Sequence, residues 1–102
     1  MARFELAALA LADVQSIMDH TSEKWGSEQA ILYLESLRLA FRRLAENPFV
    51  GVARPELGEA VRMFPHKVHL IFYRPTASGV AIARVLHGRQ DPFRHLNSPS
   101  DG

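Results

Sequence analysis

The most constraining feature of this sequence is a helical pattern of apolar residues across residues 30–45. Apolar side chains recur there at spacings of three and four over about four turns, which places them on one face of an α-helix. Asn47 should end the helix, because the residue before a proline, here Pro48, avoids the helical region. Ser27 is a candidate N-cap. The apolar stripe consists of Ala30, Tyr33, Leu34, Leu37, Ala40, Phe41, Leu44 and Ala45.

A weaker stripe of the same kind runs through residues 10–25 and should end at Gly26, because glycine commonly terminates helices. Both stripes need an apolar surface to pack on. We therefore expect the aromatic side chains of Trp25, Tyr33 and Phe41 to face a β-sheet, with Trp25 as an anchor of the helix junction. The first stripe consists of Ala10, Val14, Ile17, Met18, Thr21 and Trp25.

The linker between the two stripes is minimal, so the two helices should form an antiparallel hairpin. Leu32 and Leu39 lie off the second stripe, on a neighbouring face of the same helix. They either widen the face that packs in the core, which is the interpretation favoured here, or meet a partner.

Three β-rich segments follow the helices, at residues 60–64, 68–74 and 80–87. Turns are predicted at residues 65–67 and 75–79, where proline and glycine interrupt the pattern. Before the helices, residues 3–6 alternate polar and apolar side chains, as a short edge strand does.

The resulting order predicts an α+β fold: a strand, an antiparallel helical hairpin, then three antiparallel strands. A loop at residues 49–58 precedes these strands, and residues 92–96 are expected to form one helical turn. We expect a single domain over residues 1–96 and a flexible C-terminal tail at residues 97–102.

The last two predicted strands, residues 68–74 and 80–87, look apolar on both faces. A helical hairpin covers one face of a sheet, and the chain offers no third long element for the other. The sequence therefore predicts an uncovered apolar face that binds an extended partner or a second copy.

Composition narrows the class of protein further. The chain has no cysteine, which excludes disulfides and thiolate chemistry and is typical of a reducing compartment. Residues 1–51 carry five basic and seven acidic side chains, whereas residues 52–102 carry seven basic and four acidic ones, so the second half suits an acidic partner. The apolar segment 6–12 is too short to span a membrane, and we expect a cytoplasmic protein without a membrane contact.

Polar side chains gather where the last predicted strand ends, at residues 87–91. Such a strand end is either a functional site or a turn capped by Asp91. The five histidines show no paired metal-ligand spacing, and no metal or cofactor is predicted. In particular, His66 and His69 would point to opposite faces of a continuous strand.

An ordered set of residues, spaced over nearly the whole chain, supports a family resemblance. Its members are Ala10, Asp13, Val14, Ile17, Trp25, Gly26, Gln29, Ala30, Tyr33, Phe41, Leu44, Ala45, Pro48, Gly51, Arg54, Arg62, Phe72, Tyr73, Arg74 and residues 85–91. With this spacing the chain resembles the ParE branch of the RelE/ParE toxin superfamily. That superfamily has the strand–helix–helix–three-strand order reached above.

The resemblance implies the toxin of a type II toxin–antitoxin system, which poisons DNA gyrase by binding and is neutralised by a ParD-like antitoxin. It implies no catalytic residue, no cofactor and no sequence-specific contact with nucleic acid. The residues expected to bind a partner are Arg62, Arg74, Arg84, His87 and Arg89.

Two alternatives remain open. A RelE-like toxin cuts messenger RNA on the ribosome without a metal, and such chemistry needs an acid–base pair and cations around the phosphate. Arg62, Arg74, His87 and Arg89 are candidates here with His95 as an acid, although the tyrosine that such nucleases carry after the position of Asp91 is missing. The other alternative is a non-toxic binding domain of the same fold.

Overall fold

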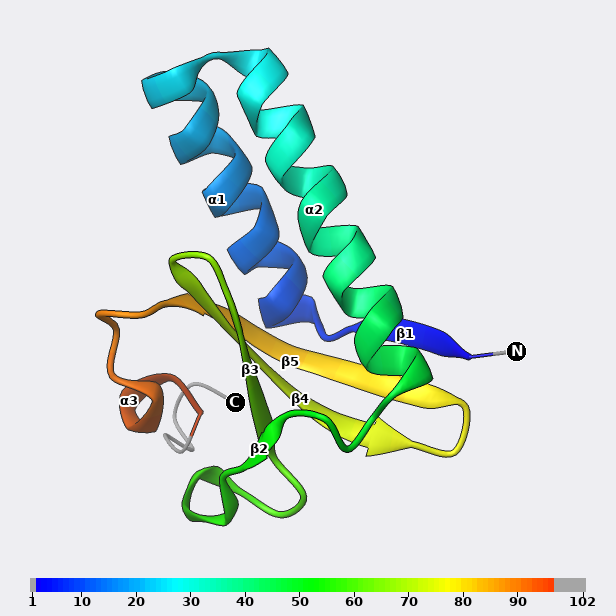
Figure 1. Cartoon of the computed structure of the whole chain (residues 1–102). Coiled ribbons are helices and arrows are strands. Elements are labelled where there is room, and N and C mark those ends of the chain that lie inside the picture. The colour runs from blue at the N-terminus through cyan, green and yellow to red at the C-terminus, as the bar shows by residue number, and fades with distance from the viewer. Residues whose placement is uncertain (1, 97–102) are drawn as a thin grey trace.

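The computed structural model describes residues 2–96 and shows a helical hairpin that rises from one face of a five-stranded sheet (Figure 1). The predicted fold class and element order are confirmed, and the tail predicted at residues 97–102 lies outside the described residues. The elements are β1 (Arg3–Leu6), α1 (Ala8–Trp25), α2 (Ser27–Glu46), β2 (Val52–Ala53), the 3-10 helix η1 (Pro55–Leu57), β3 (Arg62–His66), β4 (His69–Thr76), β5 (Gly79–His87) and α3 (Pro92–Leu96).

The sheet has the strand order β1-β5-β4-β3-β2, so the chain's first strand lies beside its last one. β1 runs parallel to the first half of β5, and the other neighbours are antiparallel. The two backbones approach closely at Gly79, where a Cβ atom would lie 1.8 Å from the carbonyl oxygen of Arg3. Only glycine fits this position, which also has a φ of +154°.

The β3–β4 turn differs from its prediction. The turn consists of Lys67 and Val68, one residue later than expected, and Lys67 adopts a φ of +56°. Pro65 suggested a turn, but it lies inside β3, where that strand has no neighbour on its outer side. The strand is not continuous through this turn: the hairpin pairs His66 directly with His69, so the two imidazoles lie on the same face.

The core between the hairpin and the sheet contains the stripe of α2 as predicted. Leu37, Phe41 and Leu44 are at most 1% exposed and pack with Ile71 and Tyr73 of β4. The predicted C-terminal boundary of α2 at Asn47 is also confirmed. Ser27, in contrast, is the first helical residue and makes no capping hydrogen bond, so its predicted capping role is wrong.

Trp25 is not a core anchor: its side chain is 66% exposed. The distal half of the hairpin projects beyond the sheet (Figure 1), so the last turn of α1 has no strand beneath it. Leu32 and Leu39 are also exposed, at 61% and 48%, so the interpretation that they widen the core is wrong.

The second face of the sheet is covered by the chain itself, which corrects the predicted uncovered face. Leu57 of η1 and Val61 pack there against Phe72 and Leu86, and all four are at most 1% exposed. Leu96 of α3 also packs against this cluster. The loop before β3 and the short helix α3 therefore cover this face together, in place of a third long element.

Replacing Phe41 by alanine should lower the free energy of unfolding by about 3–5 kcal/mol, because a large side chain leaves a packed core. Trp25→Ala is the matched control and should cost less than about 1 kcal/mol, because most of that ring already contacts water. Urea unfolding followed by circular dichroism measures both values. Equal losses in the two variants would contradict the described packing of the hairpin.

Candidate functional site

Two of the predicted partner-binding arginines hold loops in place. The guanidinium of Arg62 donates to the carbonyl oxygens of Gly51 (2.9 Å) and Phe49 (3.0 Å) and lies 5.4 Å from the ring of Phe49. Arg74 donates to the carbonyl oxygen of Glu59 at 2.9 Å. Both loops adjoin the second core cluster, formed by Leu57, Val61, Phe72 and Leu86. The two arginines therefore stabilise the fold of the isolated chain.

Arg84 joins three elements. It donates two hydrogen bonds of 2.8 Å to the carboxylate of Asp13 in α1 and one of 3.1 Å to the carbonyl oxygen of His95 in α3. Asp13 also accepts the backbone N–H of Val85, at 2.9 Å, beyond the point where β1 stops pairing with β5. Both charged side chains are 14% exposed, which makes this a largely desolvated, doubly hydrogen-bonded ion pair.

The end of β5 forms a tight hydrogen-bonded turn. The side-chain oxygen of Gln90 accepts the N–H of His87 at 2.7 Å, and Nδ1 of His87 accepts the N–H of Arg89 at 3.1 Å. Asp91 accepts the N–H of Phe93 at 2.9 Å, so it caps the turn into α3. This geometry fits the expectation of a capped turn. The side chain of Arg89, which follows in the same turn, is exposed.

The five predicted residues do not form one site. In the register of the sheet, Arg62 lies opposite Tyr73, whereas His87 lies opposite His69. These two rows are four residues apart along β4, which is roughly 13 Å. Arg62 and Arg74 therefore lie at one end of the sheet, and His87 and Arg89 at the other. Their contacts with a partner remain a prediction.

Sequence reasoning missed a cluster of polar aromatic groups around Tyr33. Its hydroxyl lies 2.6 Å from Nδ1 of His69, and its ring centroid lies 5.7 Å from that of His66. The rings of His69 and His87 meet edge to face at 5.7 Å. Ser36 donates its hydroxyl proton to the carbonyl oxygen of Tyr33, so Nε2–H of His66 must donate to Ser36. A turn placed at Lys67 and Val68 would have revealed this cluster from the sequence, because His66 and His69 then share a face of the sheet.

Burial and neighbouring charged groups favour the neutral form of His66 and His69. Burial lowers the pKa of His69, and the neighbouring His87 and His66 lower it further. Burial and the nearby Lys67 lower the pKa of His66, while burial raises the pKa of the Tyr33 phenol. In the neutral form, Nδ1 of His69 accepts a hydrogen bond from the Tyr33 hydroxyl, so the proton of the imidazole lies on Nε2.

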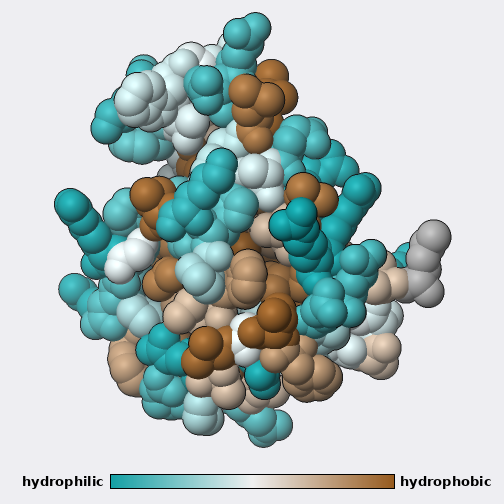
Figure 2. Space-filling view, viewed as in Figure 1, coloured by the Kyte–Doolittle hydropathy of each residue, from teal (hydrophilic) through white to brown (hydrophobic). Residues whose placement is uncertain are grey.

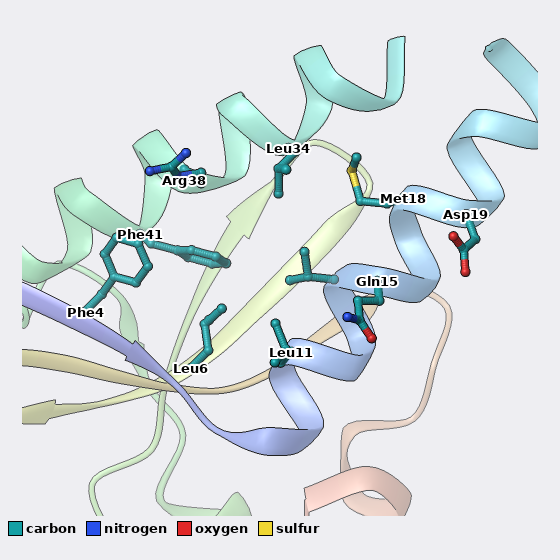
Figure 3. A pocket seen from close by; sticks show the side chains of 10 residues that line it. Phe4, Leu6, Leu11, Gln15, Met18, Asp19, Leu34, Arg38 and Phe41 are labelled. Atoms are coloured by element: carbon teal, nitrogen blue, oxygen red, sulfur yellow. The ribbon is translucent and has the colours of Figure 1, made fainter. Parts of the chain in front are cut away.

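Several hollows interrupt the surface of the described residues. A groove of about 780 Å³ lies between α1 and the ends of β4 and β5, next to Tyr33 and His87. A second hollow of about 750 Å³ lies between β5 and α3, lined by Arg89 and Arg94 among others. A third, of about 480 Å³, lies between α1, α2 and β1, and Figure 3 shows Leu6, Leu11 and Leu34 turned toward it.

This third hollow is an apolar groove, and Arg38 and Asp19 lie at its rim (Figure 3). Elsewhere on the hairpin, Figure 2 shows hydrophobic side chains interrupting a hydrophilic surface. Within residues 2–96, no cluster of three or more potential ligand side chains is arranged to hold a metal ion. None of the helices described here has the length and apolar character needed to cross a bilayer.

The Asp13–Arg84 pair should matter more to stability than a surface pair. Asp13→Asn should lower the free energy of unfolding by about 3 kcal/mol, because it leaves a largely buried guanidinium without its counter-charge. Glu35→Gln is the control: Glu35 lies 3.9 Å from Arg38 with both side chains more than half exposed, and it should cost less than about 1 kcal/mol. Chemical denaturation measures the free energy of unfolding of both variants. Similar losses in the two would contradict the importance of Asp13 for stability.

The histidine cluster predicts that stability falls on mild acidification. The pKa values of His66 and His69 are lowered from 6.5 in the folded chain, so the unfolded chain binds protons at a higher pH. The melting temperature should therefore drop as the pH falls below about 6.5 toward the lowered pKa values. In the double variant His66→Gln/His69→Gln this drop should shrink, and an unchanged slope would contradict the assignment.

Comparison with known proteins gives a consistent result. The family described as "ParE toxin of type II toxin-antitoxin system, parDE" matches residues 4–92. Toxin ParE1 of Mycobacterium tuberculosis is 39% identical over 95 residues, covering 92% of this chain and 97% of the relative. Toxin ParE1 of Caulobacter vibrioides is 32% identical over 96 residues, covering 94% and 99%.

A third relative, Toxin ParE of Escherichia coli, is 35% identical over 99 residues and covers 94% of both chains. The fold also matches a chain from the chromosomal ParDE TA system from P. aeruginosa, with a TM-score of 0.72 at 21% identity, over 85% of this chain and 96% of that one. At that identity the match shows the fold alone. The sequence relationships show more: this chain belongs to the ParE toxin family of parDE type II toxin–antitoxin systems.

Proposed function

We propose that this ParE-family toxin acts in the cytoplasm by binding DNA gyrase and holding it on cleaved DNA. Membership of the ParE family is the observation that carries the proposal, because the resemblance of the sequence to that branch implies a gyrase poison. The end of β5, with His87 and Arg89, is the part of the candidate site that we assign to the target.

The geometry favours binding over RNA cleavage. A metal-free nuclease needs several cations around one phosphate, together with an acid and a base. Arg62 and Arg74 hydrogen-bond to backbone carbonyl groups at the far end of the sheet, and Arg84 is paired with Asp13. Among the proposed catalytic side chains, this leaves His87 and Arg89 near His95 at the strand end.

We further propose that a ParD-like antitoxin neutralises the toxin by covering apolar surface on the helical hairpin. The second sheet face is not available, since the chain's own loop and α3 cover it. The hairpin instead exposes leucine and isoleucine side chains and contains the apolar groove of Figure 3. These exposed residues are Leu9, Leu11, Ile31, Leu32 and Leu39.

The test is a gyrase cleavage assay. Gyrase, ATP and supercoiled plasmid are incubated with the purified chain, and linear DNA is measured after detergent and protease treatment. Linear plasmid should accumulate with the native chain. Arg89→Ala should need about tenfold or more of the protein for the same effect, since a charged contact contributes about 1.5–3 kcal/mol. Arg42→Ala, on the outer face of α2, is the matched control and should act like the native chain.

Translating ribosomes are treated in parallel, and messenger cuts are mapped. Cut messenger with intact plasmid would overturn the proposal in favour of a ribonuclease, and His87 and His95 would then be the residues to replace. Intact plasmid together with intact messenger would overturn the proposal in favour of a non-toxic binding domain.

A further inference from the structure

Two of the surface hollows meet at Gln90. This residue lines both the groove beside α1 and the hollow beside α3. Its amide is fixed between them, because its oxygen accepts the N–H of His87 while its nitrogen lies 3.5 Å from Nε2 of His95. The result is one continuous surface along the side of the molecule that carries the β3–β4 turn and α3 (Figure 1). We call it the Gln90 track; its main residues are Lys24, Trp25, Tyr33, Arg89, Gln90 and Arg94.

The track carries a lysine, Lys24, in the groove and arginines in the hollow beside α3. None of the twelve residues that line the groove is acidic. Among the described residues that line the hollow, Arg89 and Arg94 accompany one acidic residue, Asp91, while Arg84 is already paired with Asp13. The carboxylate of Asp91 already accepts the N–H of Phe93. A polyanion would therefore meet cations at both ends of the track.

Aromatic faces are interleaved with these cations. Trp25 is 66% exposed, and Nζ of Lys24 lies 5.7 Å from its ring centroid. Nζ of Lys67 lies 5.4 Å from the ring of Tyr33, whose other neighbours are the imidazoles of His66 and His69. An exposed tryptophan beside a lysine is a stacking surface next to a charge. This pairing recurs where proteins hold unpaired bases beside their phosphates.

We propose that the Gln90 track binds single-stranded nucleic acid, with its arginines and lysines on phosphates and Trp25 stacked on a base. This goes beyond the proposed function, which names proteins alone as partners. An acidic peptide would also satisfy the charges, but it would not use the exposed aromatic faces. Binding should be independent of base sequence, because the amide of Gln90 is held by His87 and His95 rather than presented to a base edge.

The test uses the purified chain and fluorescently labelled oligothymidine of about 16 nucleotides, with anisotropy as the readout. Affinity should fall by at least about tenfold between roughly 50 mM and 200 mM salt, as phosphate contacts predict. Trp25 is the single tryptophan of the chain, so its emission reports stacking directly and should be quenched by the oligonucleotide.

Matched variants locate the contact. Lys24→Glu and Arg89→Glu should each weaken binding by about tenfold or more, and Trp25→Ala by about fivefold or more. Arg42→Glu, an equal charge change on the outer face of α2, should stay within about twofold. All four side chains are exposed, and circular dichroism melts confirm that each variant is folded.

Three results would overturn the inference: no binding at the lower salt concentration, an equal loss in Arg42→Glu, or unquenched Trp25 emission in a saturated complex. Tighter binding of polyglutamate than of the oligonucleotide, with the same variant sensitivity, would overturn it in favour of an acidic peptide. Gyrase poisoning is measured separately. Linear plasmid without oligonucleotide binding would contradict this inference and leave the proposed function intact.

Discussion

The arrangement of this molecule depends on the hydrogen bonds that the carboxylate of Asp13 accepts. The carboxylate accepts two hydrogen bonds from Arg84 and one from the backbone of Val85, so one side chain fixes α1 against β5. The same guanidinium reaches the carbonyl oxygen of His95 and so positions α3. β1 pairs with β5 no further than Ile82, and Asp13 supplies an acceptor for the edge beyond it. Arg84 also lines the hollow beside α3.

The sequence predicted the parts of the fold that rest on long periodic patterns. The stripe of α2 gave the helix, its packed face and its end at Asn47. Trp25, Leu32 and Leu39 were assigned to the core wrongly, because periodicity identifies a face of a helix but not how far the sheet extends beneath it. The second core cluster was missed for a related reason: Leu57, which packs on the second face of the sheet, lies in a loop without regular spacing.

The candidate site was predictable in its chemistry but not in its geometry. The polar turn after β5 was located from the sequence alone, and Gln90 and Asp91 hold it as a turn requires. Arg62 and Arg84 look like binding residues in the sequence, yet their hydrogen-bond partners are 11 and 71 residues away along the chain. The cluster around Tyr33 depends on a one-residue shift of the β3–β4 turn, because register decides which side chains share a face.

The central claim is that the toxin acts by binding its target through the end of β5. Photo-crosslinking tests it most directly: benzoylphenylalanine is placed at Arg89 in one protein and at Arg42 in another, and each is irradiated with gyrase and plasmid. The account predicts an adduct to gyrase from position 89 and none from position 42. An adduct from position 42 alone, with linear plasmid still formed, would contradict it.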